Sequence, residues 1–364
     1  MKPIRSNFLF LAALGLFLLG SAVAQAAAMT AEERMQFADG LFTRGIYDMA
    51  VPEYLALIRD APQYDKLDAA LFHLAESYRR LGDKGGAERF YKRLIDEYAQ
   101  SAYRFKAQYR RAELFVAGGQ YLDAVSLFRG LMDANPPPDI LAPSYYYLGY
   151  SLDKLRIQQE AEEMLKKVLD QYPDSPFASY AGLALGEIYQ RVGGRDDALR
   201  QLYHAAAEKP ATPRVGAEAL YQAAELAYRR NDFTNSAAAY RSLFEKYPAD
   251  YRAREAVLRA AWSYHNTGRY QDALDLAAAA LRETPPQQEE DWLYLKANAE
   301  RRLGRNAEAV KTYERLMSKY PSGRMAGLAA YEEALVYFKE KRYGEALAQS
   351  GRLKPGAEYE EDFF

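Results

Sequence analysis

Small residues recur along the chain in two series, and their interval predicts paired helices. The first series is spaced by 37, 37, 37, 37, 38, 37, 36 and 37 residues and is usually followed, four positions later, by Tyr, Phe or Leu. It comprises Ala50, Ala87, Ala124, Ala161, Ala198, Ser236, Ala273, Ala309 and Ala346. The second series lies twelve positions earlier and comprises Ala38, Ala75, Ala112, Gly149, Gly186, Ala224, Ala261, Ala297 and Ala334. Two small positions in each period let two helices approach closely, so we expect nine helical hairpins.

Glycine and proline mark where these helices should end. A left-handed residue ends a helix at low cost when it is Gly or Asn. The residues at this place are Gly45, Gly82, Gly119, Gly193, Asn231, Gly268 and Gly304, whereas Arg156 and Lys341 depart from the pattern. Proline disfavours helix in the residue before it and follows the second helix of most periods. These prolines are Pro62, Pro136, Pro173, Pro210, Pro248, Pro285 and Pro321.

The hairpins predict an all-α protein built as a single array. Thr30 and Glu33 have the spacing of a capping box, which places the start of the first helix. A hairpin of this kind can bury its apolar faces only by stacking on its neighbours. We therefore expect residues 27–355 to form one α-α superhelical solenoid of nine hairpins.

These features resemble the tetratricopeptide repeat (TPR) over about 90% of the chain. The resemblance rests on the pair of small residues, the Gly-x-Tyr turn (GIY, GQY, GRY), the following Ala and the final Pro. It implies a right-handed superhelix in which the first helix of each repeat, helix A, lines a concave groove. The period is three residues longer than the usual 34.

Several repeats end in Tyr-Pro, as in QYPDSP, KYPADY and KYPSGR. This variant is similar to the repeats of bacterial periplasmic proteins of the BamD and CpoB type. The chain lacks the lipidated cysteine of BamD and the coiled coil of CpoB. The resemblance therefore implies a compartment and an architecture, but not the specific role of either protein.

The charge and the cysteine content exclude several classes of function. The 48 Lys and Arg nearly balance 50 Asp and Glu, so no strong field favours nucleic acid. Without cysteine, the chain has no disulfide, thiolate metal site, cysteine nucleophile or cysteine-linked lipid anchor. His73, His204 and His265 fall at three different repeat positions, which argues against a metal cluster. We expect a non-enzymatic protein without cofactor or metal.

The N-terminus has the pattern of a secretory signal peptide. Lys2 and Arg5 precede the apolar run FLFLAALGLFLLG and the small residues SAVAQAAA. We expect cleavage after Ala26, which leaves no stable membrane anchor, and a periplasmic location if the source is bacterial. An uncleaved anchor is the alternative, although the run is shorter than the roughly 20 residues that span a bilayer.

The C-terminus resembles the beginning of another repeat. The residues EED precede Phe363 as they precede Trp292 at the start of the eighth repeat. A solenoid normally closes with a polar capping helix. We therefore expect residues 356–364 to open a tenth repeat of a chain that is truncated at Phe364.

Aromatic residues on helix A are the candidate binding residues. Tyrosines at the helix B packing position, Tyr54, Tyr91, Tyr240 and Tyr313, are expected in the core. Rings on the groove side of helix A offer a large contact area at low entropic cost. The predicted partner-binding residues are Phe72, Tyr109, Tyr146, Tyr150, Tyr180, Tyr221, Tyr228, Trp262 and Tyr294.

The leading functional hypothesis is a periplasmic scaffold that binds a protein or peptide partner in this groove, with a role in cell-envelope or outer-membrane assembly. One alternative is a glycan-binding scaffold of an exopolysaccharide secretion system, because stacked tyrosines suit sugar faces equally well. Another is the non-catalytic part of a larger protein.

Acidic and basic residues along the A helices, such as Glu76 and Arg80, are expected to form i,i+4 ion pairs that stabilise the helix.

Overall fold

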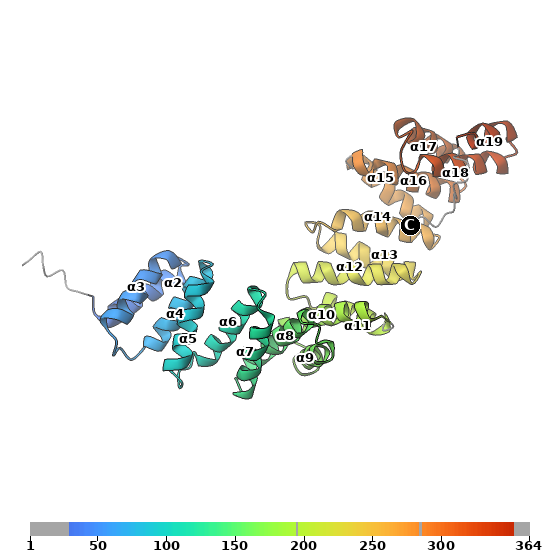
Figure 1. The fold of residues 1–364 in the computed structure, drawn as a ribbon. Helices are drawn as coiled ribbons and strands as arrows, with labels where there is room; N and C mark the ends of the chain where they lie inside the picture. The colour runs from blue at the N-terminus through green and yellow to red at the C-terminus, as the bar shows by residue number, and fades with distance from the viewer. Residues whose placement is uncertain (1–28, 194–195, 284–285, 353–364) are drawn as a thin grey trace, which may run out of the picture. The chain divides into compact units, whose positions relative to one another are not determined.

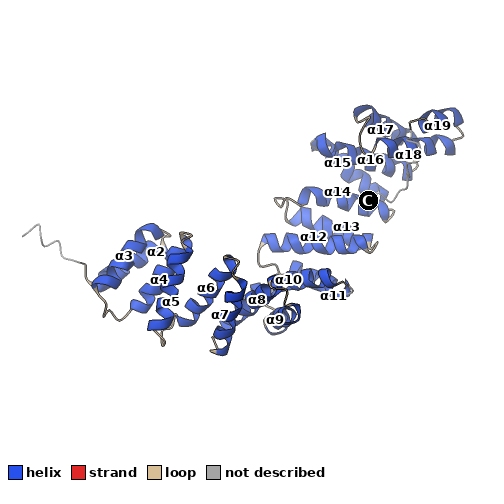
Figure 2. Cartoon of the chain, viewed as in Figure 1, coloured by secondary structure: helices blue, strands red, loops and turns tan. Residues whose placement is uncertain are grey.

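The computed structural model describes residues 29–193, 196–283 and 286–352, and these fold into eighteen helices (Figures 1 and 2). The predicted signal peptide and the predicted start of a tenth repeat lie outside the described residues. The helices that take the A position are α2 (Ala31–Thr43), α4 (Leu67–Arg80), α6 (Arg104–Ala117), α8 (Pro138–Lys154), α10 (Pro176–Val192), α12 (Pro213–Arg229), α14 (Ala253–Asn266), α16 (Pro286–Arg302) and α18 (Ala326–Lys339). Those at the B position are α3 (Tyr47–Asp60), α5 (Lys84–Glu97), α7 (Tyr121–Asp133), α9 (Gln158–Gln171), α11 (Asp196–Glu208), α13 (Phe233–Lys246), α15 (Tyr270–Glu283), α17 (Asn306–Lys319) and α19 (Tyr343–Ser350).

The helices belong to two compact units, Met1–Ile157 with α2–α8 and Gln158–Phe364 with α9–α19. Within each unit, every helix packs against the next one in sequence. Several pairs of successive A helices also touch, such as α6 with α8 in the first unit and α10 with α12 in the second. The all-α fold of stacked hairpins is thus confirmed, and its contacts are mostly between neighbours in sequence.

The small residues are buried where the two helices of a hairpin meet. Ala38, Ala50, Ala75 and Ala87, for example, have no exposed surface. The tyrosines at the helix B packing position, Tyr54, Tyr91, Tyr240 and Tyr313, are equally buried, so their assignment to the core is correct.

The fifth repeat differs from the predicted register by one residue. Ala198 is only half-buried, whereas Leu199 and Tyr203 are 3% and 1% exposed. Helix α11 begins at Asp196, so Leu199 is its fourth residue, as Ala50 is the fourth residue of α3. The side chain at this packing position is therefore Leu199, and the small residue that sequence spacing selected lies beside it.

The left-handed turn is present in every repeat, including the two that lack Gly and Asn. The predicted glycines have φ between 75° and 82°, and Asn231 has φ 57°. Arg156 and Lys341 adopt the same conformation, with φ 64° and 61°. The geometry of the hairpin therefore imposes a left-handed residue even where its side chain makes that costly.

Some of the helices begin with a side-chain cap. Thr30 and Glu33 form the expected capping box, in which the Thr30 hydroxyl accepts from the Glu33 amide at 3.2 Å and the Glu33 carboxylate accepts from the Thr30 amide at 2.9 Å. Ser175 and Thr212 cap α10 and α12. The B helices that precede the predicted prolines end before them, as α3 does at Asp60.

Candidate functional site

The nine predicted binding residues all lie on A helices, but none of them is freely exposed. Those in the first unit are Phe72, Tyr109, Tyr146 and Tyr150, and those in the second are Tyr180, Tyr221, Tyr228, Trp262 and Tyr294. Tyr109, Trp262 and Tyr294 are buried, with 8%, 6% and 5% of their surface exposed. The other six are half-buried. A bound partner could therefore contact these six rings directly, while the three buried rings support the helices beneath it.

In the first unit, aromatic contacts connect neighbouring helices. Phe72 of α4 stacks on Tyr103, with ring centroids 4.9 Å apart. The ring centroid of Tyr150 on α8 lies 6.1 Å from that of Tyr146 and 6.2 Å from that of Tyr121 on α7. Tyr146, Tyr150 and Tyr121, all half-buried, form an aromatic cluster at the junction of α7 and α8.

The packing tyrosine of helix B donates a hydrogen bond to helix A of its own repeat. The acceptor lies fifteen positions earlier on helix A, directly after the small residue of that helix. The pairs are Tyr54 with Asp39 (2.5 Å), Tyr91 with Glu76, Tyr240 with Glu225, and Tyr313 with Asn298 (3.0 Å). The hydrogen-bonding capacity of the buried phenol is thereby satisfied, and the acceptor side chain is held in place on helix A.

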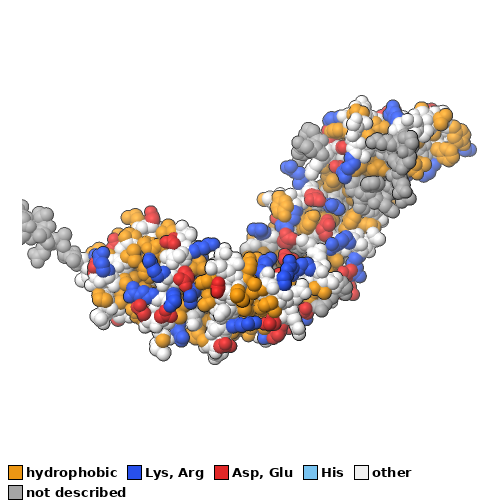
Figure 3. Space-filling view, viewed as in Figure 1, with side chains coloured by type: hydrophobic (Ala, Val, Ile, Leu, Met, Phe, Trp, Pro, Cys, Tyr) orange, Lys and Arg blue, Asp and Glu red, His pale blue; other side chains and the backbone are white. Residues whose placement is uncertain are grey.

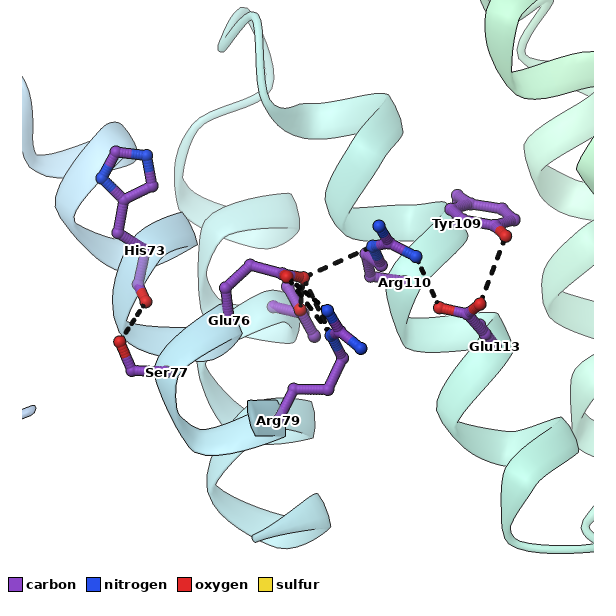
Figure 4. Close-up of polar contacts among 8 residues, drawn as sticks. His73, Glu76, Ser77, Arg79, Tyr109, Arg110 and Glu113 are labelled. Atoms are coloured by element: carbon purple, nitrogen blue, oxygen red, sulfur yellow. Dashed lines mark hydrogen bonds and ion pairs between the residues drawn. The ribbon is translucent and has the colours of Figure 1, made fainter. Parts of the chain in front are cut away.

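Ion pairs join Glu76 of one repeat to Glu113 of the next in the first unit (Figure 4). Arg79 binds Glu76 at 2.7 Å, and Arg110 of α6 reaches the same carboxylate at 3.4 Å. Arg110 also binds Glu113 at 2.8 Å. The expected pair of Glu76 with Arg80 is not the one that forms, because Arg79 and Arg110 occupy that carboxylate.

Tyr147 extends this network to α8. Its hydroxyl donates to Glu113 at 3.2 Å, and its ring stacks on Phe128 with centroids 6.1 Å apart. The buried Tyr109 also donates to Glu113, at 3.3 Å. Sequence reasoning selected Tyr146 and Tyr150 but missed Tyr147, although the run YYY at 145–147 was a signal that this turn of helix carries rings on several sides.

The pKa values of the Glu76 and Asp39 carboxylates are lowered by their partners. Burial alone would raise the pKa of Glu76, but hydrogen bonds from Arg79 and Tyr91 and the charges of Arg79 and Arg110 lower it. Burial at Asp39 is likewise outweighed, and its pKa falls because His73 and Tyr54 donate hydrogen bonds to it. Burial and the neighbouring Glu76 charge raise the pKa of the Tyr91 phenol. Neither the Tyr91 phenol nor the carboxylates of Glu76 and Asp39 are set up to exchange protons near neutral pH.

In the second unit, cations accompany the rings. The guanidinium of Arg252 lies 5.9 Å from the ring centroid of Tyr221, and that of Arg259 lies 5.9 Å from Tyr228. The ring centroids of Trp262 and Tyr294, which belong to adjacent A helices, lie 6.0 Å apart. Figure 3 shows basic, acidic and hydrophobic side chains interspersed on the face in view.

Two further features of the described residues bear on function. No group of three or more His, Asp or Glu side chains in the described ranges could hold a metal ion. None of the helices α2–α19 is long and apolar enough to cross a membrane.

Sequence comparison decides the family. Models of the tetratricopeptide repeat match residues 69–101, 144–175, 183–251, 221–287 and 294–358. The chain is a tetratricopeptide repeat protein. Such proteins generally act as non-catalytic scaffolds that bind protein partners.

The TPR chain is also 29% identical over 136 residues to the outer membrane protein assembly factor BamD of Xylella fastidiosa, in a match covering 32% of the chain and 46% of the relative. It thus spans about half the length of this relative.

The chain is also similar to several solved structures. A tetratricopeptide repeat protein of Parabacteroides merdae is 15% identical and matches 87% of this chain and 98% of its own, with a TM-score of 0.40. PilF of Pseudomonas aeruginosa is 16% identical, and the match covers 62% of this chain and 95% of the PilF chain, with a TM-score of 0.48. MamA of Desulfovibrio magneticus is 19% identical, and the match covers 50% of this chain and 94% of the MamA chain, with a TM-score of 0.41.

Proposed function

We propose that this TPR protein is a scaffold of the bacterial periplasm that holds a protein or peptide partner against the groove side of its A helices. The observation that carries the proposal is the cluster of Tyr121, Tyr146 and Tyr150, half-buried rings from two neighbouring helices of the first unit. Rings that the fold already orients lose little entropy when a partner covers them.

The cellular setting is supported by separate observations. Residues 1–26 have the pattern of a signal peptide, and the chain contains no cysteine for a lipid anchor. The relative from Xylella fastidiosa is an outer membrane protein assembly factor, which favours a role in the cell envelope. We accordingly place the protein in the periplasm, in cell-envelope or outer-membrane assembly.

Site-specific photo-crosslinking tests the proposal. Tyr146 is replaced by a photoreactive phenylalanine analogue in the full chain, which is then irradiated in intact cells. Leu122 of α7, which is 71% exposed, receives the same replacement as the matched control. We expect a defined protein adduct from position 146 and none from position 122. Equal adducts from both positions, or no protein adduct from 146, would refute the assignment.

Binding of a glycan is the second candidate, because the adjoining rings of Tyr146 and Tyr150 could also stack on sugar faces. A titration of the purified protein with oligosaccharides, followed by tyrosine fluorescence, separates the two candidates. Saturable quenching that disappears in the Tyr146→Ala and Tyr150→Ala double variant, without a protein adduct in cells, would establish the glycan function instead.

A further inference from the structure

Three cations on the A helices of the first unit have no carboxylate partner. Arg80 ends α4, Lys106 lies in the first turn of α6 and Lys154 ends α8, and all three side chains are exposed. Among the residues described, none of them forms an ion pair. Lys154 lies over the ring of Tyr150, with 4.8 Å between its Nζ and the ring centroid.

Two carboxylates of the same helices, Glu76 and Glu113, are already occupied. Glu76 is bound by Arg79, Arg110 and the Tyr91 hydroxyl. Glu113 accepts hydrogen bonds from Arg110, Tyr109 and Tyr147. The charges of Glu76 and Glu113 are therefore compensated within the fold, whereas Arg80, Lys106 and Lys154 have no carboxylate partner among the described residues and are left for an external group.

Helix stability explains the positions of only two of these three cations. A cation in the last turn of a helix is favoured by the helix dipole, which suits Arg80 and Lys154. Lys106 is in the first turn, where a cation opposes the dipole, and α6 has no acidic residue in its first turn. Its exposed ammonium is therefore mildly unfavourable in the free protein and would become favourable beside a bound carboxylate.

The three cations belong to helices that are connected on this side. The ion pair of Arg110 with Glu76 joins α6 to α4, and the hydrogen bond from Tyr147 to Glu113 joins α8 to α6. Arg80 and Lys154 lie at the C-terminal ends of α4 and α8, and Lys106 lies at the N-terminal end of α6, so a segment that meets all three cations would run along the A helices as well as across them. It would also pass the cluster formed by Tyr121, Tyr146 and Tyr150.

We propose that the A-helix side of the first unit binds an extended acidic segment of a partner protein, with its carboxylates at Arg80, Lys106 and Lys154 and its apolar side chains on Tyr146 and Tyr150. The inference rests on the proposed scaffold function and specifies the chemistry of the partner. An anionic membrane is less well matched, because the rings that would insert are half-buried rather than protruding.

The test repeats the crosslinking from position 146 and identifies the crosslinked peptide by mass spectrometry. It is done in three backgrounds: the otherwise unchanged chain, the triple variant Arg80→Glu, Lys106→Glu and Lys154→Glu, and the control Arg44→Glu. Arg44 is exposed in the turn after α2, and it forms no ion pair within the described part of the chain. We expect a peptide rich in Asp and Glu, a yield about tenfold lower in the triple variant, and an unchanged yield in the control.

The identified peptide is then synthesised together with an analogue in which Gln and Asn replace Glu and Asp. We expect the analogue to bind the purified protein about tenfold more weakly and the difference to shrink at high salt. Because the helix dipole favours Arg80 and Lys154, we expect the triple variant to melt at a somewhat lower temperature than the unchanged chain. Circular dichroism at the temperature of the binding assay should show the same helix content in both proteins, which excludes unfolding as the cause of lost binding.

Each remaining outcome has a distinct meaning. A protein adduct whose peptide is not acidic, or whose yield survives the triple substitution, would overturn this inference and leave the scaffold function standing. The absence of any protein adduct would overturn both. Binding of the purified protein to vesicles of phosphatidylcholine and phosphatidylglycerol, lost in the triple variant and without a protein adduct in cells, would assign the cations to a lipid surface.

Discussion

At the scale of single residues, Tyr91 and Tyr203 occupy equivalent core positions but differ in their hydrogen bonding. The Tyr91 hydroxyl donates to Glu76, whereas the Tyr203 hydroxyl has no hydrogen-bond partner in the described structure. Both side chains are almost fully buried. The pair therefore separates the contribution of the phenol's hydrogen bond from that of the ring.

We predict that Tyr91→Phe lowers the free energy of unfolding by about 1–2 kcal/mol, because a buried hydrogen bond to an ionised carboxylate is lost. Tyr203→Phe, the matched control, should change it by less than about 0.5 kcal/mol or stabilise the protein, because the ring stays in place and a buried hydroxyl without a partner is removed. Urea denaturation of both variants measures the difference. Equal effects would show that the hydrogen bond to Glu76 contributes nothing net.

Glu333 of α18 is the residue whose charge should make stability depend on pH. Its side chain is fully buried, and its carboxyl accepts a hydrogen bond from Gln349 of α19 at 3.0 Å. Burial and the charge of Glu314 on α17 raise its pKa to about 7, against the opposing effects of Tyr337, Arg352 and Gln349. The protonated form is therefore favoured in the folded state.

Because the folded pKa lies above the unfolded value, the stabilisation from protonated Glu333 is fully present below about pH 4.5 and is lost as the pH rises through about 7. We predict that Glu333→Gln makes the unfolding free energy at pH 8 larger by roughly 1–3 kcal/mol and abolishes most of its dependence between pH 5 and 8. Denaturation at several pH values tests this. An unchanged pH profile in the variant would show that Glu333 ionises as readily folded as unfolded.

At the scale of helices, glycine has opposite effects at two places. A Cβ on Gly186 of α10 would lie 2.5 Å from the Tyr203 ring, so this glycine lets α10 and α11 pack closely. A Cβ on Gly130 of α7 would meet nothing within 4 Å. The first glycine is required by packing, and the second only weakens its helix.

We predict that Gly186→Ala destabilises the protein by roughly 1–3 kcal/mol through overpacking, whereas Gly130→Ala stabilises it by about 0.5–1 kcal/mol through helix propensity. Thermal unfolding of the two variants gives the comparison. If both substitutions stabilised the protein, the ring of Tyr203 would have to move without cost, and close approach at Gly186 would not be a constraint.

The helices and turns could largely be predicted from the sequence, because small residues, glycines and prolines act locally and recur at a fixed period. The same reasoning placed Ala198 instead of Leu199 at the packing position, because two adjacent apolar residues satisfy the spacing equally. The candidate site was less predictable. The pairing of Arg110 with Glu76 depends on how far one hairpin is displaced from the next, which the sequence of either hairpin does not specify.

At the scale of the whole molecule, each hairpin is stabilised mainly by its neighbours in sequence, so protection from local unfolding should depend on position along the chain. Helix α17 buries Tyr313, Leu316 and Met317, whereas α19 has no buried residue and leaves Leu347 75% exposed. We predict that amide hydrogens of α19 exchange far faster than those of α17 in native-state hydrogen exchange followed by mass spectrometry. Protection of α19 comparable to that of α17 would contradict this and would show that another segment or molecule covers Leu347 in solution.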